Sequence, residues 1–255
     1  MKYFDTHAHY NDEAYKDDLT EVLAKCKNAG VDRIINVGYN KESSLKSIEF
    51  SNKYENFYAA IGVHPHDVDN DTAQDIYDMY DKNNKKIVAI GEIGFDYAFV
   101  KDNKEKQKKL FMEQIELANT LKLPISIHSR NASLDTYNTL KEKKPEYGTL
   151  FHCFQPSDDL VRLVLENNYF VAFGGNITFK RNATFKRYID MIPISQIVIE
   201  TDCPYLTPEP FRGTRNDSSH LNLVCKKLAE YKEMEEKEVS KIVYDNSLKF
   251  FKITP

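Results

Sequence analysis

The chain has 255 residues, of which 41% are hydrophobic and 29% charged, and its formal net charge is -4 at pH 7. This size and composition suit a single globular domain with a sizeable core, and the lack of any run of about 18 apolar residues excludes a membrane span. A protein that coats nucleic acid usually carries a basic excess, so the charge argues against a large nucleic-acid surface but allows a small cleft in which bound cations supply positive potential.

Eight short apolar segments, rich in β-branched and aromatic residues, recur along the chain. We predict them as the buried strands of a parallel sheet that is covered on both faces. They are Tyr3–Thr6, Arg33–Val37, Tyr58–Val63, Ile87–Ile90, Pro124–Ile127, Thr149–Phe151, Phe170–Phe173 and Gln196–Glu200.

The segments between these strands carry helical periodicity. Asp12–Ala29 places apolar side chains on one face and ends before a glycine, which commonly stops a helix. Lys104–Leu121 has the same pattern, and Ser157–Asn167 begins with a residue that caps helices well. Two further helices, roughly His220–Tyr231 and Glu235–Phe251, are expected to close the C-terminal end.

Eight strands that alternate with about eight helices predict a TIM barrel, the (β/α)8 fold, for which about 250 residues is the usual size. We expect one domain over residues 1–255, because no linker, internal repeat or low-complexity segment divides the chain. The competing architecture is an open doubly wound sheet. That fold needs a glycine-rich phosphate loop after its first strand, and Asp5–His9 (DTHAH) is not such a loop.

Histidines and acidic residues gather where the predicted strands end, and in a TIM barrel these ends form the mouth that holds the active site. Six of the seven histidines follow strands, namely His7 and His9 after the first, His64 and His66 after the third, His128 after the fifth and His152 after the sixth. Glu92 follows the fourth strand and Asp202 the eighth, whereas His220 falls outside the pattern.

This grouping predicts a metal centre, because imidazoles and carboxylates that converge on one mouth need partners for their lone pairs and charges. The predicted ligands are His7, His9, Glu92, His128, His152 and Asp202. Six ligands are too many for one tetrahedral ion, so we expect two divalent ions about 3.5–4 Å apart, with Glu92 bridging them. His7, His9 and Asp202 would hold one ion, and the other two histidines the second. The donors suit Zn, Mn or Fe and permit Mg.

A cysteine or serine nucleophile is the competing chemistry. Cys153 and Cys203 adjoin predicted ligands, but strand alternation points them away from the mouth, so we expect them to pack. The four cysteines show no CxxC spacing, which indicates free thiols in a reducing compartment. No apolar stretch long enough for a signal peptide precedes the first strand, so we expect a cytoplasmic protein without membrane association or an obligate protein partner.

Six motifs resemble the TatD family of metal-dependent deoxyribonucleases, in the family's order, from residue 5 to about residue 216. They are Asp5–His9 (DTHAH), Gly62–His66 (GVHPH), Gly91–Tyr97 (GEIGFDY), Ile127–Arg130 (IHSR), His152–Phe154 (HCF) and Glu200–Leu206 (ETDCPYL). The resemblance implies a TIM barrel with divalent metals, 3′-to-5′ exonuclease activity on DNA and, in some members, apurinic-site endonuclease activity. The ligands that it implies are the same six residues.

Two segments depart from the family's pattern. Where the family continues His-Cys-Phe with Ser-Gly, this chain has Gln155-Pro156, and a proline removes a backbone donor. After Arg212-Gly213 the family has a lysine and, further on, a proline, whereas this chain has TRNDS over residues 214–218. Neither change touches a predicted ligand, so both bear on substrate preference rather than on catalysis.

The expected reaction is attack of water on a DNA phosphate, with Asp202 as the base that takes the proton of the water. Arg130, Arg212 and Arg215 are candidates for binding phosphate oxygens, because a guanidinium fits them with two bonds. His64 is a candidate for a hydrogen bond to the phosphate or to a terminal sugar hydroxyl. We expect His66 to support the loop or a ligand.

Further contacts to DNA are weaker expectations. Lys180-Arg181 and Lys186-Arg187 follow the seventh strand, and we expect them to be solvated. Bases can stack on aromatic rings, although we expect most aromatics here to pack in the core. The aromatics in strand-end loops are Phe95, Tyr97, Phe99, Phe154, Tyr205 and Phe211.

Two other functions compete with the deoxyribonuclease. An amidase or lactonase of the wider amidohydrolase superfamily often bridges its metals with a carboxylated lysine at the fourth strand, but Glu92 occupies that place here. A non-catalytic metal-binding scaffold is the second alternative, and the complete ligand set argues against it.

Overall fold

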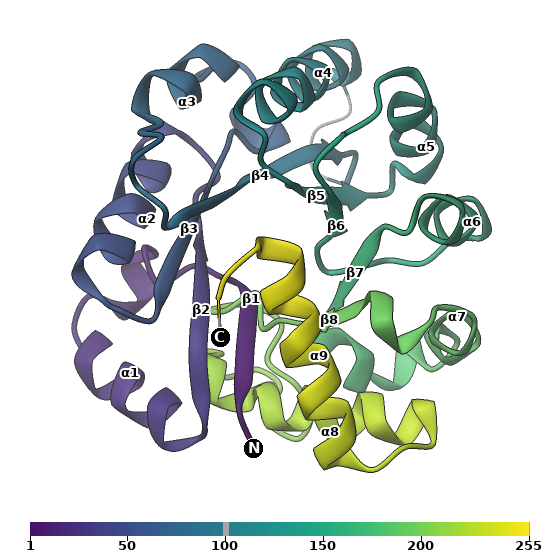
Figure 1. Cartoon of the computed structure of the whole chain (residues 1–255). Helices are drawn as coiled ribbons and strands as arrows, with labels where there is room; N and C mark the ends of the chain where they lie inside the picture. The colour runs from purple at the N-terminus through teal and green to yellow at the C-terminus, as the bar shows by residue number, and fades with distance from the viewer. Residues whose placement is uncertain (99–101, 255) are drawn as a thin grey trace.

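The structure is a computed structural model that describes residues 1–98 and 102–254, so Phe99 lies outside the described residues. Within them, eight parallel strands form one sheet whose order follows the chain, and helices surround it (Figure 1). The predicted TIM barrel is therefore confirmed. The strands are β1 (Tyr3–Ala8), β2 (Val31–Val37), β3 (Phe57–Ile61), β4 (Ile87–Asp96), β5 (Ile125–Arg130), β6 (Thr149–Phe151), β7 (Phe170–Phe173) and β8 (Ile197–Ile199).

Three strands extend further toward their C-terminal ends than expected, and one of them is β5, which continues to Arg130 instead of ending at Ile127. β1 continues to Ala8, and β4 continues to Asp96 because it keeps pairing with β5, with Gly94 opposite His128 and Asp96 opposite Arg130. His7, Glu92 and His128, which were expected after these strands, therefore lie within them, whereas His9 directly follows β1. The side chains of His7, Glu92 and His128 are set by the rigid pairing of the sheet rather than by a loop.

The helices are α1 (Leu19–Asn28), α2 (Lys41–Lys53), α3 (Ala73–Met79), α4 (Lys104–Leu121), α5 (Ser133–Glu142), α6 (Asp158–Asn167), α7 (Phe185–Met191), α8 (Leu221–Lys232) and α9 (Glu236–Phe251). The helix expected over Asp12–Ala29 begins later, at Leu19. The chain before it forms a 3-10 turn because Tyr15 turns inward and donates a hydrogen bond to the carbonyl oxygen of Asn216. No described helix is both long and apolar enough to cross a membrane.

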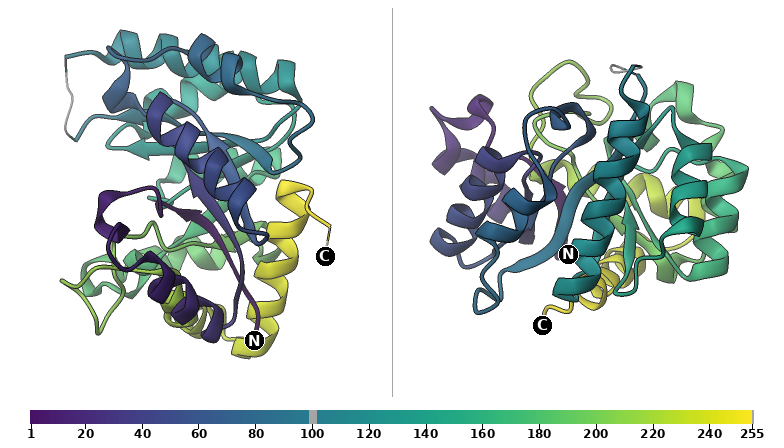
Figure 2. Two further views of the ribbon diagram at one scale, coloured as in Figure 1. Left: turned by 90° about the vertical axis from the view of Figure 1, so that its left-hand side faces the viewer. Right: turned by 90° about the horizontal axis from the view of Figure 1, so that it is seen from above.

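Both ends of the barrel are closed by C-terminal parts of the chain. At the mouth, the amide of His9 donates to the carbonyl oxygen of Cys203 over 2.8 Å, and the amide of Asp202 donates to that of His7 over 2.9 Å. At the other end, α9 runs beside β1 (Figure 2), and its Phe250 shares an apolar cluster with strand residues inside the barrel. The predicted closing helices are therefore confirmed.

Candidate metal centre

A cavity of about 1050 Å³ opens at the mouth of the barrel, where the strands end. Five of the six predicted metal ligands line it. The sixth, His7, is buried beside them, and its Nε2 atom lies 3.5 Å from Oε2 of Glu92. The ligands come from the ends of β1, β4 and β5 and from the turns after β6 and β8. The fold therefore brings together six side chains that are far apart in the sequence.

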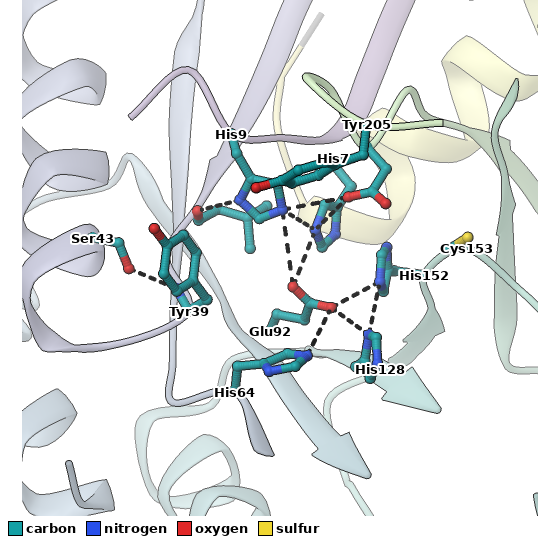
Figure 3. A network of polar contacts seen from close by, with 12 residues as sticks. His7, His9, Tyr39, Ser43, His64, Glu92, His128, His152, Cys153 and Tyr205 are labelled. Carbon is teal, nitrogen blue, oxygen red and sulfur yellow. Dashed lines mark hydrogen bonds and ion pairs between the residues drawn. The ribbon is translucent and has the colours of Figure 1, made fainter. Parts of the chain in front are cut away.

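Glu92 lies at the centre of this group, and each of its carboxylate oxygens faces a different set of imidazoles (Figure 3). Its Oε1 atom lies 2.6 Å from Nδ1 of His128 and 2.8 Å from Nε2 of His152. Its Oε2 atom lies 3.5 Å from Nε2 of His7 and 3.9 Å from Nε2 of His9. A carboxylate in this position offers one oxygen to a cation on each side.

The first set consists of His7, His9 and Asp202. The Nε2 atoms of the two histidines lie 3.1 Å apart, and Oδ1 of Asp202 lies 3.4 Å from Nε2 of His9. Nδ1 of His9 lies 3.0 Å from the carbonyl oxygen of Val37, so we assign the proton to Nδ1 and the lone pair to Nε2. Nδ1 of His7 is buried without a hydrogen-bond partner among the described residues. The ring nitrogens and the carboxylate oxygen of this set face one another, which is how ligand atoms are arranged around a cation.

The second set consists of His128 and His152, and a carboxylate lies behind each. Nδ1 of His128 and Nε2 of His152 lie 3.3 Å apart. Nε2 of His128 lies 3.1 Å from Oδ2 of Asp96, and Nδ1 of His152 lies 3.3 Å from Oε1 of Glu200. Carboxylates in this position fix the tautomer and the ring orientation of a metal-binding histidine.

Asp96 and Glu200 were not expected to serve the site, and both are buried, with 1% and 0% of their surface exposed. A signal for Asp96 is present in the sequence, because alternate residues of a strand share one face and Asp96 lies four residues after Glu92. Glu200 carries no such signal, since β8 ends at Ile199 and the period of two stops there. His66, which was expected to support a ligand, has its Nε2 atom 3.2 Å from Asp96.

Close backbone contacts hold the ligands in register. Gly94 has a φ of 137°, and a Cβ atom there would collide with the carbonyl oxygen of His128, so β4 and β5 approach this closely only with glycine. Asp202 has a φ of 55°, in the left-handed region that few residues other than glycine and Asn or Asp adopt. The hydrogen bonds that close the barrel at His7 and Asp202 hold this conformation.

Burial and mutual attraction set the charges of the site. Burial by itself raises the pKa of Glu92, but the neighbouring His152, His64 and His128 outweigh it and hold that pKa well below its usual range. Burial by itself lowers the pKa of His152, but the carboxylates of Glu92 and Glu200 hold it well above the usual value. In the absence of a cation, His152 therefore keeps a proton beside an ionised carboxylate, and a cation would take the place of that proton.

Three overlapping groups of ligand atoms fit a divalent cation, because the atoms of each group lie within 4.8 Å of one another. The groups are His7 with Glu92 and His152, His7 with His9 and Asp202, and His64 with Asp96 and His128. Mixed imidazole and carboxylate donors suit Zn and Mn and permit Mg. The donor set of this cavity therefore fits the metals expected from the sequence.

Two of the four residues expected to bind substrate line the cavity. These are His64, whose Nε2 atom lies 3.7 Å from Oε1 of Glu92, and Arg130 at the end of β5. Burial and the nearby His128 hold the pKa of His64 well below its usual value, so this imidazole is neutral. Arg181, which was expected to be solvated, also lines the cavity from the 3-10 turn after β7.

The other two candidates, Arg212 and Arg215, do not belong to the lining of the cavity. The guanidinium of Arg212 lies over the ring of Phe179, 4.0 Å from its centroid. Arg215 donates to both carboxylate oxygens of Asp18, one of them over 2.9 Å. Both arginines therefore have partners within the loops around the mouth. The departure from the family's pattern at residues 214–218 also lies outside the lining, whereas Pro156 belongs to it.

The strand-end aromatics divide in the same way. Phe95, Tyr97 and Phe154 are buried in the core, whereas Tyr205 and Phe211 are 54% and 47% exposed. Tyr205 lines the cavity and Phe211 does not. Tyr39, at the end of the second strand, also lines it, although the sequence did not single it out.

The two cysteines next to the ligands behave differently from each other. Cys203 is fully buried, as expected from strand alternation. Cys153 lines the cavity instead, because its φ of 41° takes the chain out of the extended conformation on which alternation depends. Burial raises the pKa of its thiol well above the usual value, so it is a poor nucleophile.

The chain is similar to known metal-dependent hydrolases over almost its whole length. Residues 4–252 match a model of the family described as TatD related DNase. The metal-dependent hydrolase YabD of Bacillus subtilis, itself uncharacterized, is 41% identical over 252 residues, which cover 98% of this chain and 99% of that protein. The corresponding hydrolase MJ1582 of Methanocaldococcus jannaschii is 31% identical over 99% of this chain and 98% of its own. Among solved structures, the TatD homologue YJJV of Escherichia coli K12 superposes with a TM-score of 0.92 at 26% identity, covering 99% of this chain and 98% of that one.

Proposed function

The chain belongs to the family of TatD-related DNases, and from that premise we propose that this metal-dependent hydrolase is a deoxyribonuclease that cleaves DNA phosphodiester bonds with two divalent ions, Mg, Mn or Zn. The observation that carries the proposal is the position of Glu92, whose two carboxylate oxygens face two separate sets of donors. An amidohydrolase-type lysine bridge has no counterpart at this place in β4.

Each ion has its own donors in this proposal. His7, His9 and Asp202 hold one, His128 and His152 hold the other, and Glu92 is shared. When bound, the ions supply Lewis-acid chemistry that activates water and neutralises charge on the phosphate. Asp96 and Glu200 keep the rings of the second pair turned toward Glu92.

The side chains of the cavity then orient the substrate and move the proton. Burial by itself raises the pKa of Asp202, but the hydrogen bond from His9 and the nearby imidazoles hold it below the usual value, so its carboxylate is ionised and accepts the proton of the attacking water. His64 is neutral and donates a hydrogen bond to a phosphate oxygen or a sugar hydroxyl. Arg130 binds the non-bridging oxygens through its guanidinium.

We propose that the enzyme removes nucleotides from single-stranded ends in the 3′-to-5′ direction, as its resemblance to the TatD family implies. The test is cleavage of single-stranded DNA that is labelled at its 3′ end or its 5′ end, in the presence of Mg²⁺ or Mn²⁺. Early release of the 3′ label as mononucleotide, with progressive shortening of the 5′-labelled strand, is the expected result. No product from either label, with metal demonstrably bound, would sink the nuclease proposal.

The same centre is proposed to cleave the backbone at apurinic sites in duplex DNA. A duplex with one internal apurinic site separates this activity from the exonuclease, because a single incision gives one discrete product instead of a ladder. An intact duplex of the same sequence is the control. Absence of the discrete product under conditions in which single strands are degraded contradicts this part of the proposal.

We place this activity in the cytoplasm, in the repair or fragmentation of DNA. The four cysteines are all free in the described part of the chain, which suits a reducing compartment. Fractionation of cells that carry a tagged chain tests the location, and recovery of the protein outside the cytoplasmic fraction contradicts it.

A further inference from the structure

The lining of the cavity includes aromatic rings and positively charged side chains besides the candidate metal ligands. Tyr39 and Tyr205 follow β2 and β8, the two neighbours of β1, and their rings lie 5.7 Å and 6.3 Å from the ring of His9. Figure 3 shows both tyrosines beside His9 and away from His128. Arg130 and Arg181 line the same cavity from β5 and from the turn after β7. We call Tyr39 and Tyr205 the aromatic wall of the cavity and Arg130 and Arg181 its basic wall.

Tyr205 is exposed yet firmly held. Its hydroxyl donates to Oδ2 of Asp12 over 3.0 Å, and its amide donates to the carbonyl oxygen of Asp202 over 2.9 Å. Its own carbonyl oxygen accepts a hydrogen bond of 2.7 Å from the side chain of Asn216. A ring that is already fixed loses little conformational entropy when a ligand stacks on it, which favours a role in binding.

Tyr39 is held through its backbone at the edge of the same wall. Its amide donates to Oγ of Ser43 over 2.8 Å, and its carbonyl oxygen accepts a hydrogen bond of 2.7 Å from the amide of His64. This tyrosine is half-buried, so less of its ring is available for stacking than of the exposed ring of Tyr205.

Arg130 and Arg181 are the only lysine or arginine side chains in the cavity lining within residues 1–98 and 102–254. The guanidinium of Arg181 lies 5.7 Å from the centroid of the Phe179 ring, which supports it at the rim. The chain as a whole carries a net charge of -4, so this positive charge is local to the mouth. The same lining holds the carboxylates of Asp67, Glu92, Asp96 and Asp202, so bound cations together with the two guanidinium groups would supply the positive charge that attracts phosphates.

We propose that the aromatic wall stacks the terminal base of a single strand while the basic wall binds the phosphates of the rest of the strand. This inference rests on the proposed deoxyribonuclease function and adds the orientation of the bound strand. The cavity of about 1050 Å³ exceeds what a drug-sized ligand needs, which leaves space for a nucleoside and its neighbouring phosphates. Stacking accepts every base, so the site selects a free single-stranded end and not a sequence.

The first test measures stacking without turnover. Glu92→Gln protein, which should bind strands but not cleave them, is titrated with oligonucleotides that carry the fluorescent base 2-aminopurine at the 3′ end or at the 5′ end. We expect Glu92→Gln protein to quench the fluorescence of the probe at one end of the strand. The Glu92→Gln/Tyr205→Leu double variant should no longer quench it. Quenching at the 5′ end supports the stacking wall and contradicts the proposed 3′-to-5′ polarity, so the two proposals fail separately.

The second test uses turnover. Tyr205→Leu should raise KM about tenfold for a strand that ends in a normal nucleotide and leave KM nearly unchanged for the same strand with an abasic terminal nucleotide. Tyr205→Phe keeps the ring and loses only the hydroxyl bond to Asp12, so it should raise KM much less than Tyr205→Leu does. Tyr77→Leu is the matched control, since Tyr77 is 50% exposed on α3 and does not line the cavity. Equal effects of Tyr205→Leu on both strands, or no effect, overturn the stacking role.

The basic wall is tested by salt. The salt dependence of binding reports the number of phosphates neutralised, so Arg181→Ala should lower the slope of log affinity against log salt concentration by about one. Lys180→Ala is the control, because Lys180 is the exposed neighbour outside the lining. An unchanged slope in Arg181→Ala, or the same loss in both variants, contradicts the assignment.

Discussion

The charge on Glu92 depends on the side chains that surround it. Its carboxylate is buried, which alone would keep it protonated, yet three imidazoles hold its pKa well below the usual range. Those imidazoles are in turn affected by Glu92, since its carboxylate raises the pKa of His128 and His152 against the effect of burial. The charges on Glu92 and on the surrounding imidazoles depend on one another. Removal of the Glu92 carboxylate should therefore affect metal binding more than folding.

Glu92→Ala should reduce kcat by about 1000-fold or more, because a shared ligand of both ions is lost and with it several kcal/mol of charge stabilisation. The fold should remain, since the barrel and its closure do not depend on this side chain. Nuclease assays together with circular dichroism measure both effects. Turnover close to that of the wild type would mean that Glu92 does not bridge the ions.

Asp96 acts through His128 and not on the substrate. Burial by itself raises the pKa of Asp96, but its contacts with His128 lower that pKa to about 2, so the carboxylate is ionised where it faces the ring. Asp96→Asn should weaken metal affinity by about 10- to 100-fold, because the orientation and basicity of His128 are no longer fixed. Metal titration by calorimetry measures this. Asp69→Asn, a change in the exposed pair with Lys106, is the control and should leave metal affinity unchanged.

The turn before α8 shows how one element is tied to another that is remote in sequence. Asp217 caps the 3-10 turn Ser218–His220 by accepting a 2.9 Å hydrogen bond from the amide of Ser219, and its other oxygen lies 2.6 Å from Nζ of Lys25 on α1. Burial by itself raises the pKa of Asp217, but the hydrogen bonds from Lys25 and Ser219 hold it below the usual value.

Asp217→Asn should lower the free energy of unfolding by about 1 kcal/mol at pH 7 through the lost ion pair with Lys25, because asparagine caps a helical turn about as well as aspartate. Because the pKa of Asp217 is lower in the folded state, its carboxylate stabilises the fold fully at a pH above its unfolded pKa of about 3.9. This stabilisation is lost as the pH falls through the folded pKa. The difference between the two proteins should therefore shrink in acid. Denaturant unfolding at several pH values measures it, with Asp245→Asn in the exposed pair with Lys241 as the control. If the difference in free energy of unfolding between the two proteins is the same in acid, the ion pair is not the cause of it.

Bound metal should stabilise the whole barrel, because the ligands come from five different strand ends and an ion links them. At a free Mn²⁺ concentration of about 100 times Kd the gain is about 2.7 kcal/mol, provided that the unfolded chain does not bind the ion. For a chain of this size, this corresponds to a rise in Tm of roughly 5 to 10 °C. Thermal unfolding with Mn²⁺ and with a chelator measures the difference.

This stabilisation should weaken as the pH falls. His152 has a pKa well above the usual value when no metal is present, so it holds a proton that metal binding must displace. Acidification increases competition from that proton, and the rise in Tm at a fixed Mn²⁺ concentration should decrease. Glu92→Ala is the control and should show little rise at any pH. An equal rise in both proteins would contradict binding at this centre.

Much of the fold could be predicted because it is encoded locally. Short apolar segments rich in β-branched and aromatic residues identified eight strands, and Ser157 and Lys104 marked helices within one residue of where α6 and α4 begin. Where prediction and structure differ, a distant contact is the reason. The helix expected from Asp12 begins at Leu19 because Tyr15 turns toward Asn216, 201 residues away.

The six candidate ligands were predicted from the sequence by itself, since their residue types and their places at strand ends follow from local pattern. Which side chains support them was decided only by the tertiary structure. Arg215 pairs with Asp18 across 197 residues, while Arg181 reaches the cavity and Cys153 departs from strand alternation. The physical reason is that periodicity sets which way a side chain points along its own strand, whereas its partners depend on how the barrel closes and on the loops above the mouth.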